Sequence, residues 1–168
     1  VANIGGLLSQ WPAGLISDRM DRRNVIAFMA LISGSATLVL FLLSGSLPML
    51  FFYSLLFVWG AGSLSFYGVC IAHGVDRVSD EDMTPMMSML LMVWAFGSIV
   101  GPVLAGLVMR SPLGASGLFA FSTACLGTLF VVMLFRRVER AQVPEDEQSN
   151  WQPNLPAGLP GGDLDPRT

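Results

Sequence analysis

The sequence predicts an all-α, polytopic membrane protein, and its composition and long apolar segments are the two observations that predict it. Of the 168 residues, 53% are hydrophobic and 12% are charged, and the mean hydropathy is +0.63. Soluble domains are roughly a quarter charged, so a water-facing surface would lack charge here. No Asp, Glu, Lys or Arg occurs in residues 25–43, 47–72, 86–109 and 117–135.

Each of these segments is close to the ~20 residues that a helix needs to cross the ~30 Å hydrocarbon core of a bilayer. Only helices and closed barrels satisfy their backbone polar groups in lipid, and the alternating pattern of barrel strands does not occur. A fifth, shorter apolar stretch opens the chain. We therefore expect five transmembrane helices, over approximately residues 1–16, 25–43, 48–72, 85–109 and 116–135.

The two ends of the chain predict a fragment with a tail. Residues 1–16 lack the basic start and cleavage site of a signal peptide, so we expect an upstream part to be missing. Residues 139–168 are rich in Pro, Gly and acids, which predicts a disordered tail after a membrane domain at 1–138. Cys70 and Cys125 match no metal or redox spacing, and we expect neither metal nor cofactor.

Arginine alone indicates the orientation, because the chain has no lysine. Five crossings place three segments on one side: the loop at 17–24, the loop at 73–85 and the region after the last helix. These segments hold every arginine near the membrane except Arg110. The positive-inside rule therefore places the C-terminus in the cytoplasm, and we expect a bacterial inner membrane.

A charged motif follows the first helix and reads GLISDRMDRR over residues 14–23. It resembles the signature of the major facilitator superfamily (MFS), which lies between the second and third helices of each six-helix half. The matching residues are Gly14, Asp18, Arg19, Arg22 and Arg23. The resemblance implies that the glycine admits a neighbouring helix and that the charged residues form a latch broken during transport. We also expect the arginines to lie among anionic headgroups.

One position departs from this signature, because the family usually has Gly where the chain has Asp21. This change removes a residue suited to positive φ and adds a negative charge, so we expect an altered latch. The alternative interpretation of the motif is a positively charged loop without a gating role.

A second resemblance lies in the fourth expected helix, at Gly97, Gly101, Pro102 and Gly106. It is similar to the glycine-proline signature of MFS helices five and eleven, in which glycines permit close packing and proline bends the helix. Thr84 and Pro85 suit an N-cap and a first helical position. We therefore expect Asp18 to face the positive end of this helix.

The uncharged third segment and its ending at 71–77, IAHGVDR, resemble helix ten of a bacterial MFS branch of unassigned substrate. This resemblance implies helices eight to twelve of a twelve-helix fold, most of one six-helix bundle, with the N-terminal half of the same transporter as the missing partner. It also implies secondary active transport by alternating access about a midplane site.

Polar and aromatic residues recur on single helix faces and are our candidates for lining that site. They are Asn3, Gln10, Tyr53, Trp59, Tyr67 and Trp94. A cavity of this composition suits a neutral or weakly amphipathic organic solute, and the partners expected are this solute and the bilayer, with no nucleic acid. His73 is the candidate coupling residue, because no acid lies within the apolar segments.

Two other functions remain open. A sensor or scaffold of MFS type is favoured by Asp21 and by the acidic tail. A polytopic membrane enzyme is disfavoured, because His73 stands alone and the acids near it make no metal spacing.

The topology yields a first prediction. In a Cys70→Ala, Cys125→Ala background, a single cysteine at Ser46 should react with an impermeant thiol reagent in intact cells, since its loop faces outward. Cysteines at Ser79 or in the tail should react only after permeabilisation. Labelling of either in intact cells would show that a span is miscounted or inverted.

Overall fold

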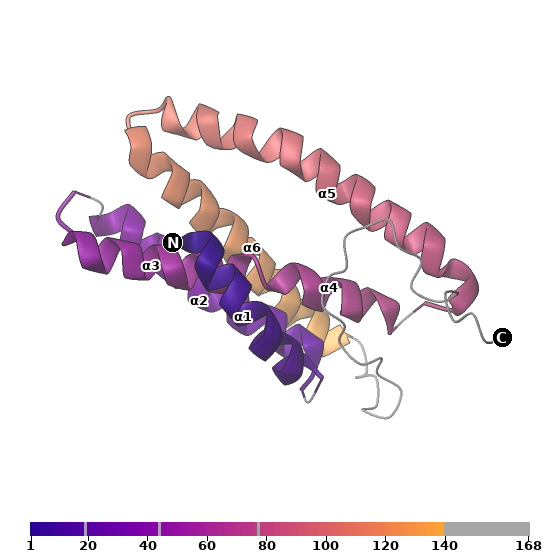
Figure 1. Cartoon of the computed structure of the whole chain (residues 1–168). Helices are drawn as coiled ribbons and strands as arrows, with labels where there is room; N and C mark the ends of the chain where they lie inside the picture. Colours follow the sequence, from indigo (N-terminus) through magenta and orange to yellow (C-terminus); the bar gives the residue numbers. More distant parts are fainter. Residues whose placement is uncertain (19, 44, 77, 140–168) are drawn as a thin grey trace, which may run out of the picture.

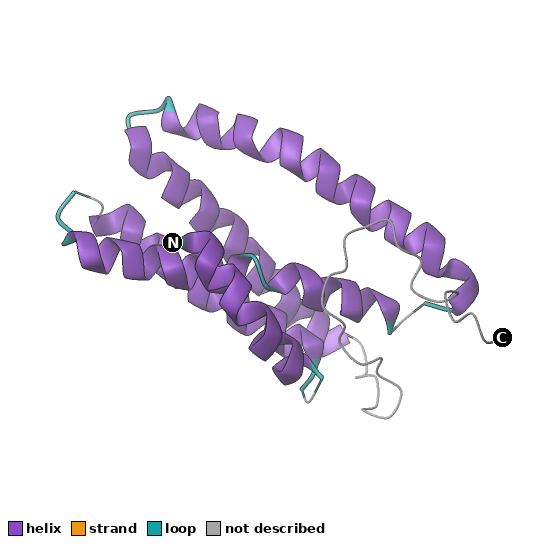
Figure 2. Ribbon diagram, in the orientation of Figure 1, coloured by secondary structure: helices purple, strands orange, loops and turns teal. Residues whose placement is uncertain are grey.

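The computed structural model describes residues 1–18, 20–43, 45–76 and 78–139 (Figure 1). Within these ranges every regular element is a helix (Figure 2). The helices are α1 (Ala2–Ser17), α2 (Arg22–Leu43), α3 (Met49–Ser63), α4 (Phe66–Val75), α5 (Asp80–Met109), the 3₁₀ turn η1 (Gly114–Ser116) and α6 (Gly117–Glu139). The disorder predicted for the tail falls on residues 140–168, which lie outside the described part.

The all-α, polytopic fold class is confirmed. Four helical segments of the described chain are long and apolar enough to cross a membrane: Arg22–Leu43, Met49–Val75, Glu81–Met109 and Gly114–Arg136. The helix α1 has 16 residues and is therefore about 24 Å long at a rise of ~1.5 Å per residue. Because α1 begins at Ala2, the span expected over residues 1–16 stays a prediction, and the other four expected spans correspond to segments of spanning length.

The segment expected as one helix over 48–72 consists of two, because α3 ends at Ser63 and α4 begins at Phe66. The two residues between them keep helix-like dihedrals, with φ −87° and ψ −17° at Leu64 and φ −90° and ψ −26° at Ser65. The break therefore interrupts the hydrogen-bond ladder without reversing the chain, and α4 continues beyond α3 (Figure 1).

The start of α5 also differs from the prediction. The helix begins at Asp80 with Ser79 as its N-cap residue, so Thr84 and Pro85 lie inside it. The Ser79 hydroxyl donates to Asp82 Oδ2 at 3.0 Å. Proline is tolerated in the first turn of a helix, where the backbone N–H groups lack helical partners. Pro85 lies just beyond the first turn of α5.

The core forms around α2, which packs against α6 on one side and α3 on the other, while α1 lies on α3. Val25 and Ile26 of α2 and Val69 of α4 are buried together. Glycines bring α1 and α3 into close contact. A Cβ atom at Gly60 would overlap the backbone of Ala2, and one at Gly5 would overlap the Phe57 carbonyl.

The helix α5 stands apart from α1–α4 along most of its length and meets α6 near its C-terminal end (Figure 1). Only 6% of its most apolar window is buried. Its glycines were expected to pack closely against another helix, but a Cβ atom at Gly97, Gly101 or Gly106 would meet nothing within 4 Å. Pro102 is exposed as well. The expected packing is therefore not made within the described chain.

The contrast between these glycines gives a second prediction. Gly60→Ala should lower the free energy of unfolding of the chain in detergent by about 1–3 kcal/mol, because an added methyl group overpacks the contact with α1. Gly101→Ala is the matched control and should be neutral or stabilising, since alanine is the better helix former and nothing lies near it. Equal effects of the two substitutions would contradict the packing of α1 on α3.

Candidate functional site

The loop between α1 and α2 is ordered by backbone hydrogen bonds at both of its ends. Asp18 is the C-cap residue of α1, and its N–H donates to the Gly14 carbonyl at 3.0 Å. At the other end, the Asp21 carbonyl accepts the N–H groups of Asn24 and Val25 at 2.8 and 3.3 Å. The two ends of the charged motif are thus held by these bonds, and its first arginine, Arg19, lies outside the described residues.

Asp21 is the N-cap of α2. Its Oδ1 accepts the backbone N–H of Arg23 at 2.9 Å, which satisfies one of the N–H groups that a helix start leaves without partners. Among the described residues, no amino acid other than glycine has a positive φ. Asp21 therefore does not need the positive φ that glycine favours, and Asp and Gly are both favoured N-cap residues.

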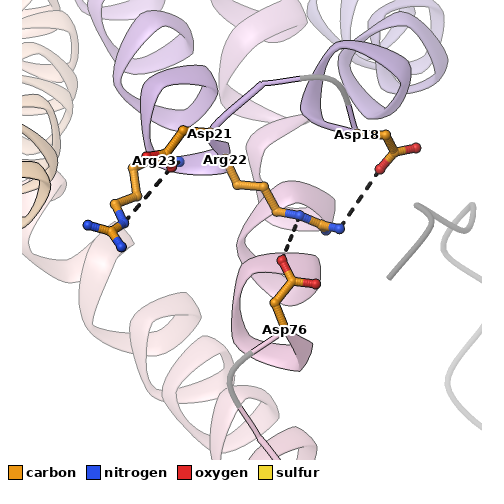
Figure 3. A network of polar contacts seen from close by, with 5 residues as sticks. All are labelled: Asp18, Asp21, Arg22, Arg23 and Asp76. Atoms are coloured by element: carbon orange, nitrogen blue, oxygen red, sulfur yellow. Dashed lines mark hydrogen bonds and ion pairs between the residues drawn. The ribbon is translucent and has the colours of Figure 1, made fainter. Parts of the chain in front are cut away.

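Arg22 joins three helices through its guanidinium group (Figure 3). Its Nε lies 2.9 Å from Asp76 Oδ2 at the end of α4, and its Nη2 lies 3.9 Å from Asp18 Oδ1 at the end of α1. The side chains of Arg22 and Asp76 are 1% and 2% exposed, whereas Asp18 is 25% exposed. One buried cation therefore has a close, buried carboxylate and a more distant, solvated one.

Burial decides what this cluster contributes. Removing two charges from water offsets much of their attraction, so a buried pair adds little stability compared with apolar residues of the same size. Removing one partner of a buried pair lowers the stability of the folded state strongly, because the other charge stays buried without compensation. The pair between Arg22 and Asp76 therefore specifies one arrangement of α2 and α4 more than it adds to overall stability.

Arg23 makes the second long-range contact of the motif. Its Nη1 donates to the backbone carbonyl of Arg136 at 2.8 Å, and its Nε lies 3.9 Å from Asp21 Oδ1. Arg136 lies in the last turn of α6, where carbonyls lack partners within the helix. The guanidinium thus caps α6 and complements the negative end of its dipole.

These contacts correct the expected exposure of Arg22 and Arg23 to lipid headgroups, while the expectation for Arg19 stays a prediction. Arg22 and Arg23 are 1% and 3% exposed and are bound within the protein. The prediction that Asp18 faces the positive end of α5 stays a prediction, because its ion pair is with Arg22. Gly14 is buried in α1, as expected for a residue at a helix contact.

The candidate cavity residues are not brought together around one hollow. A pocket of about 420 Å³ lies among α1, α2 and α3 and is almost wholly apolar, with Pro12, Phe28 and Phe57 in its wall. It contains none of the six residues predicted to line a solute site. Asn3, Tyr53 and Trp94 are exposed, while Gln10, Trp59 and Tyr67 are partly buried.

One cause of this mismatch is the packing of Gly60. This glycine lies seven residues from both Tyr53 and Tyr67, and it is buried against the backbone at the start of α1. The interruption at Leu64 and Ser65 also separates Tyr53 and Tyr67 onto two helices. His73, the candidate coupling residue, lies partly buried in the last turn of α4, one turn before Asp76.

Sequence reasoning missed Asp76 as a site residue. It lies in the segment at 71–77 whose resemblance was noticed, but no spacing rule links it to Arg22, which is far away in the chain. The only available signal was that an acid at the end of an apolar helix and an arginine at the start of another would share one membrane face.

Comparisons with known proteins agree with the signature in this loop. Residues 1–159 match the family model of the Major Facilitator Superfamily. An uncharacterized MFS-type transporter of Yersinia enterocolitica, YE1530, is 27% identical over 142 residues, which cover 83% of this chain and 34% of the relative. The MFS-type transporter YcaD of Salmonella typhi is 26% identical over 139 residues, with the same two coverages. The chain thus spans about a third of the length of these curated relatives. No solved structure matches the chain significantly.

The buried pair gives a third prediction. Asp76→Ala should lower the free energy of unfolding by about 1.5–3 kcal/mol, because the buried Arg22 guanidinium loses its close charge-assisted contact and Asp18 lies at 3.9 Å. The double variant Arg22→Met, Asp76→Leu should recover most of this loss, measured by denaturant unfolding in detergent. Glu81→Ala, which removes an exposed acid next to α4, is the control and should change stability by less than about 0.5 kcal/mol. A loss in the double variant as large as in Asp76→Ala would contradict the ion pair.

Proposed function

The chain belongs to the major facilitator superfamily, and on that premise we propose that it forms part of a secondary active transporter that moves a small organic solute by alternating access. The observation that carries this proposal is the position of Arg22. The arginine lies in the family's signature loop and is buried between carboxylates of two other helices. A charge cluster at the junction of three helices is suited to holding one conformation of a membrane bundle and releasing it in another.

The two carboxylates provide a route for release. Arg22 is bound closely to Asp76, and Asp18 Oδ1 lies 3.9 Å from Arg22 Nη2 on the more solvated side of the guanidinium. When α4 moves away from α2, the guanidinium transfers its pairing from Asp76 to Asp18 and does not become an isolated buried charge. The exchange lowers the barrier between two packed arrangements, because an unpaired charge in a low-dielectric site is strongly disfavoured.

The proposed setting is the bacterial inner membrane, with the signature loop and the C-terminus in the cytoplasm. The supporting observation is the distribution of arginines along the chain. The loop at 17–24, the loop at 73–85 and the region after α6 hold every arginine near the membrane except Arg110. Five crossings would place these three segments on the same, cytoplasmic side. Residues 1–138 are proposed as the C-terminal transmembrane half, helices eight to twelve, and residues 139–168 as its cytoplasmic tail. The facing half is proposed as the partner that completes the solute site.

The proposed solute is neutral or weakly amphipathic. No acidic or basic residue lies within the long apolar segments, and the polar groups available there are amides, hydroxyls and aromatic rings. Asn3, Tyr53 and Trp94 are exposed on three different helices, which leaves them available to a surface completed by the other half. His73 is proposed to take part in proton coupling.

Two observations support the transport proposal over the competing functions. The sensor or scaffold interpretation rested partly on Asp21, whose side chain caps α2 and needs no altered latch to explain it. The relatives are named as transporters.

Transport by the native gene product that carries this chain is the fourth prediction. Its overexpression in bacteria should change the distribution of at least one organic solute between cells and medium, as measured by untargeted mass spectrometry. Asp76→Asn should reduce this change about tenfold or more at equal membrane abundance, because the neutral amide no longer holds Arg22. Glu81→Gln is the matched control. If no solute responds to the wild-type protein, the transport proposal fails and a sensor is favoured.

A further inference from the structure

The break between α3 and α4 leaves a backbone carbonyl in the membrane-spanning segment without its usual partner. The last backbone bond of α3 runs from the Leu64 N–H to the Gly60 carbonyl at 3.1 Å. The next carbonyl in the series is that of Ala61, which accepts the hydroxyl of Ser9 from α1 at 2.6 Å. In hydrocarbon no water is available to bind such a group, so the partner must come from the protein.

Ser9 is itself held by a second hydroxyl. Its Oγ lies 2.6 Å from the Oγ of Ser65, which is 3% exposed and sits at the break. Ser65 Oγ also lies 3.3 Å from the Gly6 carbonyl of α1. Each hydroxyl has one proton to donate. Donation from Ser65 to Ser9 and from Ser9 to Ala61 satisfies the freed carbonyl and uses the two shortest contacts.

The close approach of α1 makes this bridge possible. Gly5 and Gly6 lie against Phe57 and Leu64, with no room for a Cβ atom at either glycine. The helices are therefore near enough for a short serine side chain on α1 to reach the main chain of α3. A hydroxyl that also lies within 2.8 Å of the Gly5 carbonyl has an alternative acceptor in its own helix, so the bond to Ala61 is exchangeable.

The bridge lies at one end of α4, and the latch lies at the other. The ten residues of α4 extend about 15 Å at a rise of ~1.5 Å per residue. Ser65 is the N-cap residue at one end and Asp76 is the C-cap residue at the other. Between these ends, Val69 is fully buried against Val25 and Ile26 of α2. A change in the direction of α4 at the break therefore moves Asp76 relative to Arg22.

We propose that Ser9 is a positioning residue. By binding the Ala61 carbonyl, it keeps the backbone hydrogen bonds interrupted between α3 and α4. This interruption sets the direction of α4 that brings Asp76 to Arg22. Without the Ser9 hydroxyl, the Ala61 carbonyl regains the Ser65 N–H, α3 and α4 join into one continuous helix, and Asp76 is displaced. Only the description of the Arg22–Asp76 pair as a transport latch rests on the proposed function; the bridge does not.

Distances between spin labels test this proposal. Labels at Leu31 on α2 and Ser79 beyond α4, both exposed, are introduced into the cysteine-free native gene product in lipid nanodiscs. Pulsed electron resonance then measures the distance distribution. Ser9→Ala should shift the ratio of two populations by about 2- to 10-fold, the range that corresponds to the net contribution of one hydrogen bond. Ser9→Thr keeps the hydroxyl and should restore the original distribution.

Ser54→Ala is the matched control, because this α3 hydroxyl bonds only to Leu50 of its own helix and its loss should leave the distances unchanged. If Ser9→Ala does not give folded protein, Ser65→Ala decides in the same assay, with a shift in the same direction expected. An unchanged distribution in the folded serine variant, or an equal shift in Ser54→Ala, overturns the proposal. The distances are recorded without any solute, so a failure of the transport assay leaves this result standing, and the reverse also holds.

Discussion

Helix ends and helix breaks leave backbone groups without helical partners, and the contacts that bind these groups organise this structure. Arg23 binds a carbonyl at the end of α6, Asp21 binds an N–H at the start of α2, and Ser9 binds the carbonyl freed between α3 and α4. The bond of Arg23 joins α2 to α6, the bond of Ser9 joins α1 to α3, and the bond of Asp21 is local to the start of α2. Satisfying the backbone therefore also fixes how the helices are arranged.

A related constraint, the burial of a charged side chain, explains the importance of Arg22. A guanidinium that is 1% exposed requires a carboxylate, and the nearest one is supplied by the last turn of α4. Such a pair contributes little net stability, but it strongly disfavours arrangements in which the guanidinium is separated from both Asp76 and Asp18. The signature loop, which reads as a surface feature in the sequence, is thus the place where three helix ends are held together (Figure 3).

The outer helices follow a different rule. Lipid tails are as apolar as leucine side chains, so a helix in a membrane needs no hydrophobic contact with its neighbours. The helix α5 accordingly exposes Trp94, Phe96 and Ile99, and 6% of its most apolar window is buried, compared with 44% for α2. Its glycine face is open in the described chain, and the chain covers about a third of the length of its curated relatives. The close packing predicted for these glycines is thus not made within the described chain.

The sequence by itself determined the all-α membrane fold, because segments of ~20 residues without charge have few other stable structures in lipid. It also determined the family, through the spacing of Gly14, Asp18 and Arg22. Only the tertiary structure decided that Asp76 completes the charge cluster, that Asp21 caps α2, and that Ser9 and Ser65 bridge a break in what looked like one helix. The physical reason is that periodicity and composition describe single helices, whereas these contacts depend on the distances and angles between helices.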